Sequence, residues 1–554
     1  MTPPLVELRE ITVRLPDADR PTLDRVGLEI EEGELLLVSG PTGAGKSTLL
    51  GVLSGLVPRF SGGDLSGRFL LGGVDLTAAP PRERAERIGY VGQDPAAGFV
   101  TDTVEEELAY GMEQLGLAPA TMRRRVEETL DLLGIADLRQ RDLRTLSGGQ
   151  AQRVAIGSVL TMHPALLVLD EPTSALDPTA AEEVLATLAR LVEDLATTVV
   201  IAEHRLERVV PFADRIALLP GDGSLRVGEP AEMLADAPLA PPLIELGRAL
   251  RMDPLPLTVR ETRRRLRREL AVDRLQAPGP ESLNPTPAPV ATPTLAAVGV
   301  AVDRGRRHVL DRVDLRLTAG RVSALMGRNG SGKSTLLWTL QGTQERRAGR
   351  IRVTGSGGTD VDPADLKPAE RRRHVGLLPQ TASDLLYLET VAAECAAAGP
   401  TTRAILDRLV PGIPDQRHPR DLSEGQRLAL ALAIVLAADP PVLLLDEPTR
   451  GLDYLAKTAL VQILREQAAA GRAVLVATHD VEFVAHVADD VVVLAEGEVV
   501  SEGPARRVVA ETPAFAPQVT KVLGPGWLTV DEVLAQVAYL DRAAPRSGEG
   551  SASA

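Results

Sequence analysis

Short apolar runs recur along the chain, each followed by glycine or by polar residues. Their length and aliphatic content predict strands that are buried on both faces. Three such runs occur in each half: GELLLVSG, ALLVLD and TTVVIAEH in the first, and RVSALMG, PVLLLD and AVLVATH in the second. Segments with helical spacing, such as KSTLLGVLSGL and KSTLLWTLQG, follow the first run of each set. Alternating strands and helices predict an α/β fold built on parallel strands.

The pattern is an internal duplication. Landmark residues recur in one order, separated by 275 to 287 residues, and the second copy is 11 residues shorter between its glutamine and its serine. The matched pairs are Lys46 and Lys333, Gln93 and Gln380, Ser147 and Ser423, Asp170 and Asp446, and His204 and His479. A repeat of this kind predicts two similar domains.

The duplication extends past the two main domains. LTVRE near residue 257 matches LTVDE near residue 528, and both are Thr-x-x-Glu capping boxes that open a helical pattern. A Pro-rich stretch between the copies predicts an extended linker. We therefore expect a first domain over 1–232 with an appendage over 233–275, a linker over 276–294, a second domain over 295–508 with an appendage over 509–541, and a disordered tail over 542–554.

Composition narrows the function classes. The net charge of −15 disfavours a nucleic-acid or anionic-lipid partner, although a local basic patch is compatible with it. A single cysteine excludes an internal disulfide, and no apolar run reaches the length of a membrane span. We expect a protein without a transmembrane segment of its own. Only five lysines occur, and two of them occupy matching positions in the glycine-rich stretches, which indicates a chemical role.

The glycine-rich stretches, GPTGAGKSTLL and GRNGSGKSTLL, each lie between a predicted strand and a predicted helix, as a phosphate-binding P-loop requires. Glycines let backbone N–H groups close around phosphates, and the helix directs its N-terminus at the anion. A single match could be an ordinary turn, but two matches with the same flanks make that interpretation remote. The predicted nucleotide-binding residues are Gly40, Gly43, Gly45, Lys46, Ser47 and Thr48, with Gly327, Gly330, Gly332, Lys333, Ser334 and Thr335.

Acidic pairs end the second strand of each copy. A carboxylate at the end of an apolar strand is costly unless it binds something, so Asp170 and Asp446 are predicted Mg²⁺ ligands together with Ser47 and Ser334. Glu171 and Glu447 come next and are candidates for the base that polarises the attacking water. Solvent-facing acidic pairs are common, but that alternative does not explain DEPT twice at matched positions.

Four further residues are weaker candidates. His204 and His479 end the third strand and are predicted to contact the γ-phosphate, although single histidines are usually structural. Gln93 and Gln380 are predicted to orient water and to bind Mg²⁺. The assignment of all four residues depends on their lying close to a P-loop.

In this order, the motifs resemble those of the ATP-binding cassette (ABC) ATPases. GPTGAGKST, Gln93, LSGGQ, LLVLDEPTSALD and EH are similar to the family's Walker A, Q-loop, signature, Walker B with D-loop, and H-switch. GRNGSGKST, Gln380, LSEGQ, LLLLDEPTRGLD and TH repeat the set. The resemblance implies two P-loop NTPase nucleotide-binding domains, each with a RecA-like core and a helical signature subdomain, paired head to tail about a pseudo-twofold axis.

The resemblance also implies two composite ATP sites with Mg²⁺, in which the signature of one domain completes the site of the other. The first would combine Lys46, Ser47, Gln93, Asp170, Glu171 and His204 with Ser423 and Gly425; the second would combine Lys333, Ser334, Gln380, Asp446, Glu447 and His479 with Ser147, Gly148 and Gly149. Both sets are intact, so both sites are expected to hydrolyse ATP. ATP would close the intramolecular pair of cassettes and hydrolysis would reopen it.

Two departures from the family pattern affect these expectations. At the position of the usual adenine-stacking aromatic, the chain offers Leu15 and Val302, so an aliphatic contact with the base is expected instead. Glu424 replaces a glycine of the second signature, which suggests two unequal sites.

YVGQDPAAGFVTDTVEEELAYGMEQLGL and AEHRLERVVPFADRI, with the appendages, resemble the ATPases of energy-coupling factor (ECF) importers, which take up vitamins or transition metals. This implies a peripheral position on the cytoplasmic face of the membrane. It also implies two partners, an integral-membrane coupling subunit and a substrate-binding membrane subunit. The length difference between copies would then match an asymmetric partner, although ordinary loop variation explains it about as well.

Three alternatives remain open. A soluble tandem ABC ATPase acting on ribosomes would also have two cassettes and no span, but the only basic helical stretch here is TVRETRRRLRREL. The fused ATPase of a sugar importer is another possibility. A nucleotide-gated module without turnover conflicts with the intact Glu171 and Glu447.

Overall fold

The structure is a computed structural model of the 554-residue chain. It describes residues 3–16, 18–174, 176–238, 240–269, 277, 294–305, 307–354, 360–512 and 515–543. The expected linker over 276–294 lies outside the described residues except at its Ala277 and Thr294 positions. The expected tail lies outside them beyond residue 543.

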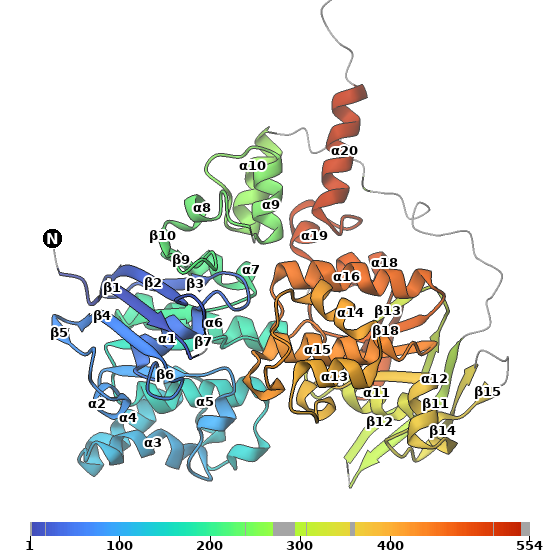
Figure 1. The fold of residues 1–554 in the computed structure, drawn as a ribbon, viewed down its shortest axis with the longest axis horizontal. Coiled ribbons are helices and arrows are strands. Elements are labelled where there is room, and N and C mark those ends of the chain that lie inside the picture. The colour runs from blue at the N-terminus through green and yellow to red at the C-terminus, as the bar shows by residue number, and fades with distance from the viewer. Residues whose placement is uncertain are drawn as a thin grey trace, which may run out of the picture. The chain divides into compact units, whose positions relative to one another are not determined.

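The first copy contains ten strands and ten helices within the described residues, coloured blue to green in Figure 1. The strands are β1 (Val6–Arg14), β2 (Leu23–Ile30), β3 (Leu35–Ser39), β4 (Asp64–Leu71), β5 (Val74–Asp75), β6 (Ile88–Val91), β7 (Leu166–Asp170), β8 (Thr198–Ala202), β9 (Arg215–Leu218) and β10 (Arg226–Gly228). The helices are α1 (Lys46–Ser54), α2 (Pro81–Arg84), α3 (Val104–Gln114), α4 (Pro119–Leu132), α5 (Gly148–Leu160), α6 (Pro178–Leu195), α7 (Leu206–Val209), α8 (Pro230–Met233), α9 (Pro242–Ala249) and α10 (Val259–Glu269).

The second copy repeats this order element by element within the described residues. Its strands are β11 (Leu295–Arg304), β12 (Arg307–Leu317), β13 (Val322–Met326), β14 (Ala348–Thr354), β15 (Asp360–Val361), β16 (Val375–Leu378), β17 (Val442–Asp446), β18 (Ala473–Ala477), β19 (Asp490–Ala495) and β20 (Glu498–Pro504). Its helices are α11 (Lys333–Gln341), α12 (Pro368–His374), α13 (Val391–Ala398), α14 (Thr402–Leu409), α15 (Glu424–Ala437), α16 (Tyr454–Ala469), α17 (Val481–Val487), α18 (Ala505–Glu511), α19 (Gln518–Leu523) and α20 (Val530–Ala543).

Each copy contains two sheets with the same strand order. A four-stranded antiparallel sheet runs β2-β1-β4-β5, and its counterpart runs β12-β11-β14-β15. A six-stranded sheet runs β10-β9-β3-β8-β7-β6, and its counterpart runs β20-β19-β13-β18-β17-β16. All neighbours in these larger sheets are parallel except the edge pairs β9–β10 and β19–β20. The predicted α/β fold class is confirmed.

The central strands are apolar along their whole length because both faces of each sheet are covered. Every residue of β3, β7 and β8 is buried, and the same holds for β13, β17 and β18. One face of each larger sheet shares an aliphatic core with the neighbouring four-stranded sheet and with α1 or α11. The carboxyl ends of neighbouring parallel strands meet at one edge, which is where an open α/β sheet binds its ligand.

By contacts, the chain divides into two compact units. The first comprises Met1–Pro241 together with two short segments of the second copy, Leu422–Gln426 and Arg450–Lys457. The second comprises Pro242–Asp421, Arg427–Thr449 and Thr458–Ala554. The first unit therefore includes residues that are distant in sequence, namely the second signature and the stretch after the second DEPT motif.

Within the second unit, the helices after each cassette share one small core. Leu246, Leu266, Trp527 and Val533, from α9, α10 and the segment around α20, are members of this buried cluster. The Arg263 guanidinium of α10 donates to the Val522 carbonyl of α19 at 3.2 Å. The appendages of the two copies are thus one packed element and not two separate ones.

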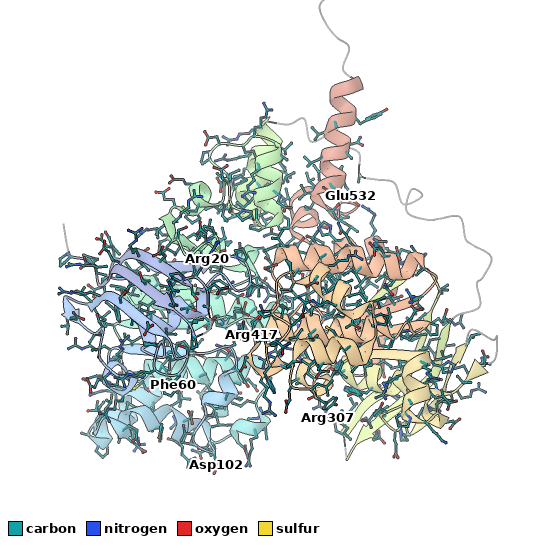
Figure 2. The ribbon with its side chains drawn as sticks, in the orientation of Figure 1. Arg20, Phe60, Asp102, Arg307, Arg417 and Glu532 are labelled. Atoms are coloured by element: carbon teal, nitrogen blue, oxygen red, sulfur yellow. The ribbon has the colours of Figure 1, made fainter. Side chains whose placement is uncertain are left out.

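The predicted capping boxes open α10 and α20. Thr258 and Thr529 accept hydrogen bonds through their hydroxyls from the backbone N–H of Glu261 and of Glu532, at 3.1 and 3.4 Å. Glu532, at the base of α20, accepts in return from the Leu528 and Thr529 N–H groups (Figure 2). Among the described residues, every helix is either too short or too polar to cross a bilayer.

Candidate active sites

The two P-loops have the same backbone geometry. Gly40 and Gly327 have φ of 152° and 150°, and a Cβ at either position would collide with the carbonyl oxygen of Leu219 or of Leu494. Gly45 and Gly332, with φ of 102° and 106°, occupy the residue before α1 or α11 in the left-handed conformation. Only glycine adopts these conformations without strain, so the sequence forces a tight turn directly before the helix.

The P-loop lysines are buried and held by the loop itself. The Lys46 Nζ donates to the carbonyls of Gly40 at 2.8 Å and Pro41 at 3.0 Å. The Lys333 Nζ donates to Gly327 at 2.8 Å and Arg328 at 3.1 Å. Burial lowers the pKa of Lys46, while the charges of Glu171, Asp453 and Asp170 oppose that shift. A cation with two carbonyl partners in a buried loop is well suited to bind phosphate oxygens.

Each strand-end aspartate meets the serine that follows the P-loop lysine. Ser47 hydrogen-bonds to Asp170, and Ser334 to Asp446. Burial raises the pKa of Asp170 to about 6, with a further contribution from the Glu171 charge, and burial also raises the pKa of Asp446 to about 6. The Asp446 Oδ2 atom is buried without a hydrogen-bond partner among the described residues.

These features fit a divalent cation. A carboxylate and a hydroxyl side by side are oxygen ligands of the kind that Mg²⁺ takes in nucleotide sites. The buried, unpartnered Asp446 oxygen leaves one such ligand atom available. Burial raises the pKa of both aspartates even though the P-loop lysines oppose the shift, so a bound cation would stabilise their ionised forms.

The predicted base of the first site is positioned by a histidine and a glutamine. Glu171 follows β7 with φ of 50°, an uncommon conformation for a residue other than glycine. Its N–H donates to the Ala202 carbonyl at 2.9 Å, and its Oε1 lies 2.7 Å from the His204 Nε2. Burial raises the pKa of Glu171, but the hydrogen bonds from His204 and Gln93 and the Lys46 charge outweigh burial and hold it below its usual value.

The second site repeats this arrangement with different contacts. Glu447 has φ of 49°, and its N–H donates to the Ala477 carbonyl at 2.8 Å. The His479 Nδ1, instead of Nε2, lies 2.9 Å from the Glu447 Oε1. The Thr478 hydroxyl donates to the other carboxylate oxygen at 3.2 Å. Gln380, at the end of β16, is exposed.

The sequence reasoning missed Glu203, which takes the place of Thr478 in the first copy. Glu203 is 1% exposed and accepts hydrogen bonds from the N–H groups of Thr173 at 3.0 Å and His204 at 2.9 Å, and from the Thr173 hydroxyl. It joins the turn after Glu171 to the start of the histidine segment. In the second copy the equivalent threonine, Thr449, has a buried hydroxyl without a partner among the described residues.

The two signature serines cap helices. Ser147 accepts from the Gln150 N–H at 3.4 Å before α5, and Ser423 accepts from the Gln426 N–H at 3.2 Å before α15. In both cases the glutamine amide oxygen accepts in return from the serine N–H, at 3.0 and 3.1 Å. Each signature therefore presents a helix N-terminus, which favours an anion. The side chain of Glu424 lies outside the described residues.

Within the first compact unit, the first P-loop lies against residues of the second signature and of the stretch after the second DEPT motif. The Thr42 N–H of the first P-loop donates to the Asp453 Oδ2 at 2.8 Å. A Cβ at Gly425 would lie 3.7 Å from the Thr42 Cγ2. Burial raises the pKa of Asp453, but the hydrogen bonds from the Thr42 and Ala456 N–H groups outweigh it, so the pKa lies below its usual value. Residues of the second copy therefore contact the first P-loop.

The residues expected to contact adenine differ between the copies. Leu15, directly after β1, is half-buried. Val302, within β11, is fully buried in the core of the second copy. A contact between Val302 and a nucleotide base is thus inconsistent with its burial.

A pair of buried glutamates was also missed. Glu107 in α3 accepts from the Val100 and Thr101 N–H groups, both at 3.0 Å. At the same spacing in the second copy, Glu394 in α13 accepts from the Tyr387 and Leu388 N–H groups at 2.5 and 2.6 Å. Each glutamate holds a loop seven residues beyond the glutamine, Gln93 or Gln380. The side chains that these loops present are apolar and exposed: Val100 is 62% exposed and Tyr387 81%.

The comparison with known sequences identifies the family. The ABC transporter family pattern matches residues 23–174 and 310–450, which contain both P-loops and both acidic pairs. The chain belongs to the ABC transporter family. Members of this ABC family bind and hydrolyse ATP, generally with Mg²⁺.

This ABC protein is similar to one relative along nearly its whole length and to one solved structure over about half of it. An ABC transporter ATP-binding protein of Streptomyces avermitilis is 55% identical over 96% of this chain and 99% of its own. CbiO1 of Clostridium perfringens, described as part of the ABC transporter complex CbiONQ, is 27% identical with a TM-score of 0.40 over 48% of this chain and 96% of its own. A chain in the complex of archaeal ribosomal stalk protein aP1 and ribosome recycling factor aABCE1 is 19% identical with a TM-score of 0.55, over 88% of this chain and 90% of its own, a likeness of fold alone.

Proposed function

We propose that this ABC ATPase is the energising subunit of an ECF-type membrane importer that takes up a vitamin, a vitamin precursor or a transition metal ion. It would act at the cytoplasmic face of the membrane as a peripheral protein. Its partners would be an integral-membrane coupling subunit and a membrane subunit that binds the cargo. Its two cassettes would pair within the chain.

In the proposed mechanism, each ATP lies on a P-loop whose lysine, Lys46 or Lys333, binds the β and γ phosphates. Mg²⁺, when bound by the serine hydroxyl and the strand-end aspartate, would neutralise developing charge on the phosphate oxygens. Glu171 or Glu447 polarises the attacking water, and the histidine hydrogen-bonded to it holds the carboxylate in place. The depressed pKa of Glu171 keeps that base ionised at neutral pH.

The signature of the opposite cassette would complete each site. For the first site, this proposal is supported by the inclusion of Leu422–Gln426 and Arg450–Lys457 in the first compact unit and by the bond from Thr42 to Asp453. Ser423 and Gly425 would then meet the γ-phosphate at the N-terminus of α15. By the symmetry of the duplication, Ser147, Gly148 and Gly149 would complete the second site.

Hydrolysis at both sites rests mainly on one observation, the matched geometry of Glu171 and Glu447. Each follows a Mg²⁺-ligand candidate, has φ near 50° and contacts a histidine nitrogen within 3 Å. Other residues of the chain share this φ, so the support comes from its combination, in both copies, with a buried carboxylate beside a histidine nitrogen. A module without turnover would not need this geometry twice.

The glutamate variants test this part of the proposal. The double variant Glu171→Gln, Glu447→Gln should lower the steady-state ATPase rate by at least about a hundredfold, because a general base contributes that much. Glu182→Gln, an exposed change on α6, is the matched control and should retain the full rate. A double variant with more than a tenth of the original rate would contradict the assignment.

Coupling to a membrane subunit is supported by the two glutamate-held loops. Val100 and Tyr387 occupy equivalent positions just after the Q-loop glutamines, and both expose apolar surface. The buried carboxylates accept from the backbone N–H groups of these residues, so the exposed side chains are presented from a fixed loop, as a docking contact requires. The different side chains at the two positions fit an asymmetric membrane partner.

Copurification tests the proposed coupling to a membrane subunit. Purified from detergent-solubilised membranes, the tagged chain should carry integral-membrane proteins, and Val100→Asp with Tyr387→Asp should lose them while keeping ATPase activity. Tyr539→Asp, an exposed tyrosine change on α20, is the control. Recovery of ribosomes in place of membrane proteins would favour a ribosome-associated ATPase.

A further inference from the structure

The helix α10 is strongly basic within an acidic chain. Its eleven residues, VRETRRRLRRE, include six arginines and two glutamates, whereas the whole chain has a net charge of −15. Of its two apolar residues, Leu266 is buried in the appendage core and Val259 packs against that core, and Thr262 is also buried. The helix is therefore fixed by one face and presents arginines on the other.

Two of the arginines have structural partners. Arg263 donates to the backbone carbonyls of Lys521 and Val522. Arg265 forms an ion pair with Glu261 at 3.0 Å and donates to the Pro254 carbonyl. These contacts give both guanidinium groups a partner and fix the helix against neighbouring segments of the chain.

The remaining four, Arg260, Arg264, Arg267 and Arg268, are exposed and form no ion pair or hydrogen bond with any residue that the structure describes. Arg260, Arg264 and Arg268 follow one another at intervals of four residues, so they lie along one face of the helix over about 12 Å. Like charges at this spacing repel one another, so the row is unfavourable without an anion.

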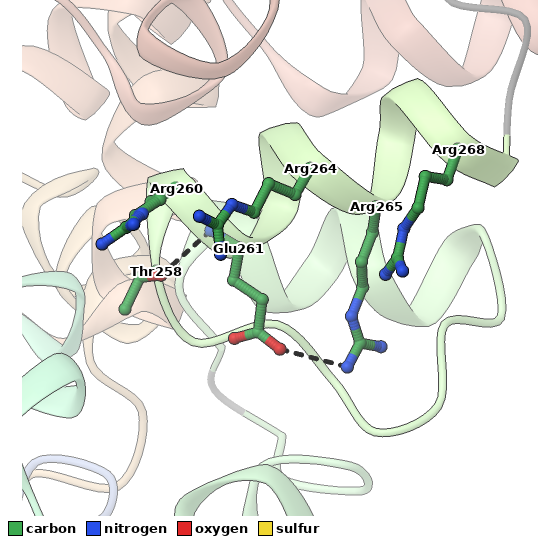
Figure 3. A pocket seen from close by; sticks show the side chains of 6 residues that line it. All are labelled: Thr258, Arg260, Glu261, Arg264, Arg265 and Arg268. Carbon is green, nitrogen blue, oxygen red and sulfur yellow. Dashed lines mark hydrogen bonds and ion pairs between the residues drawn. The ribbon is translucent and has the colours of Figure 1, made fainter.

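Three of these arginines line a pocket of about 370 Å³. Its other lining residues are Thr258, Glu261 and Arg265 (Figure 3). In Figure 3 the Arg264 side chain runs back toward Arg260, and Arg268 lies beside Arg265. The pocket walls are thus guanidinium groups, one hydroxyl and one carboxylate that is already paired.

We propose that this arginine pocket on α10 binds a compact soluble anion with several linked phosphate groups, such as a short linear polyphosphate. Guanidinium groups bind phosphate oxygens in a bidentate way, and several in a row suit several phosphates. The Arg264 and Arg268 heads would contact successive phosphates of one ligand.

The lining disfavours other anionic partners. It contains no aromatic side chain on which a base could stack, so a single-stranded nucleic acid would gain only backbone contacts. It contains no apolar side chain to receive an acyl chain of a lipid. A long polyanion would also extend beyond the 12 Å row onto a chain of net negative charge, whereas a compact one would not.

Calorimetry with inorganic tripolyphosphate tests the proposal. The full chain is first saturated with Mg²⁺ and a non-hydrolysable ATP analogue, so that the P-loops are filled. We expect one binding event per chain, and Arg264→Gln should weaken it by about tenfold or more, as loss of a charged hydrogen bond does. Arg267→Gln removes the same charge from the same helix outside the pocket and should change the affinity by less than about twofold.

Three outcomes would overturn the proposal: no binding of tripolyphosphate, equal weakening by Arg264→Gln and Arg267→Gln, or stronger binding of single-stranded RNA or anionic vesicles than of tripolyphosphate. A second readout is the unfolding midpoint followed by Trp527 fluorescence in a Trp338→Phe background, which leaves Trp527 as the only tryptophan. Tripolyphosphate should raise this midpoint, and should not do so when Arg264→Gln is added, because a ligand that binds only the folded state stabilises it.

Discussion

At the scale of single residues, the two candidate sites hold their proposed catalytic glutamates through different neighbours. Glu171 and Glu447 share a backbone conformation and a histidine contact. In the first copy, however, Glu203 ties the DEPT turn to the histidine segment, whereas in the second the Thr478 hydroxyl donates directly to Glu447. This difference, together with Glu424 in one signature, gives a physical basis for unequal turnover at the two sites.

We therefore expect Glu203→Gln to slow the first site. The neutral amide keeps the size of the side chain but places an NH₂ group against one of the N–H donors of Thr173 or His204. In a Glu447→Gln background, kcat should fall by about three- to tenfold with less than a twofold change in KM, because the P-loop is unaltered.

The control for this experiment is Glu193→Gln, an exposed change on α6, which should leave both constants unchanged. An unaltered kcat in Glu203→Gln would show that the carboxylate has only a packing role. A rise in KM without loss of kcat would place its effect on nucleotide binding instead.

At the scale of elements, buried glutamates of α3 and α13 fix the loops that follow the Q-loop glutamines. We expect Glu394→Ala to speed amide hydrogen exchange at Tyr387 and Leu388 by about tenfold or more, since both N–H groups lose their acceptor. Hydrogen exchange followed by mass spectrometry measures this in the full chain.

The neighbouring change Glu389→Ala, at an exposed position, provides the comparison for Glu394→Ala and should leave exchange in this loop unchanged. If Glu394→Ala also left it unchanged, the loop would be held by other contacts. In that case the carboxylate would not be what presents Tyr387.

Much of each element could be predicted from local sequence. The runs at β3, β7 and β8 gave strands because unbroken aliphatic residues suit a strand with both faces covered. The P-loops could be predicted because their glycines permit a backbone conformation that other residues do not adopt without strain. Glu107, Glu203 and Glu394 could not be predicted. Each accepts hydrogen bonds from backbone N–H groups of a loop or turn, and such contacts leave no periodic pattern in the sequence. Val302 was misread because spacing alone does not tell which side of a strand faces the core.

The packing of the appendage helices gives a second prediction at this scale. Leu246 is fully buried in the core that α9 and α10 form with α19 and α20. Leu246→Ala should destabilise this core by about 2–5 kcal/mol. In a Trp338→Phe background, Trp527 is the only tryptophan, so its fluorescence should report a lower urea midpoint.

Leu195→Ala, which shortens an exposed leucine in the first copy, is the corresponding control and should leave the Trp527 midpoint in place. Should Leu246→Ala and Leu195→Ala behave alike, the appendages would not form a common core in solution.

At the scale of the whole molecule, the duplication places two similar halves in one chain, and residues of both halves meet within each compact unit. Within the second unit, α9 and α10 of the first copy share their core with α19 and α20 of the second. Within the first unit, Asp453 of the second copy caps the first P-loop at Thr42. Fusion makes such contacts intramolecular and raises the effective concentration of each partner.

We expect the chain to work when cut, provided that both pieces are present. Residues 1–275 and 276–554, produced separately, should each hydrolyse ATP at a small fraction of the rate of the full chain, because each lacks the signature that completes its site. Mixing them should restore activity with a dependence on concentration, since the shared appendage core must form between molecules. Leu246→Ala in the first piece should shift that dependence to higher concentration, while Glu171→Gln should leave association intact and remove turnover at the first site. Full activity of either piece by itself would mean that each cassette builds a complete site alone, and the composite arrangement proposed for both ATP sites would have to be abandoned.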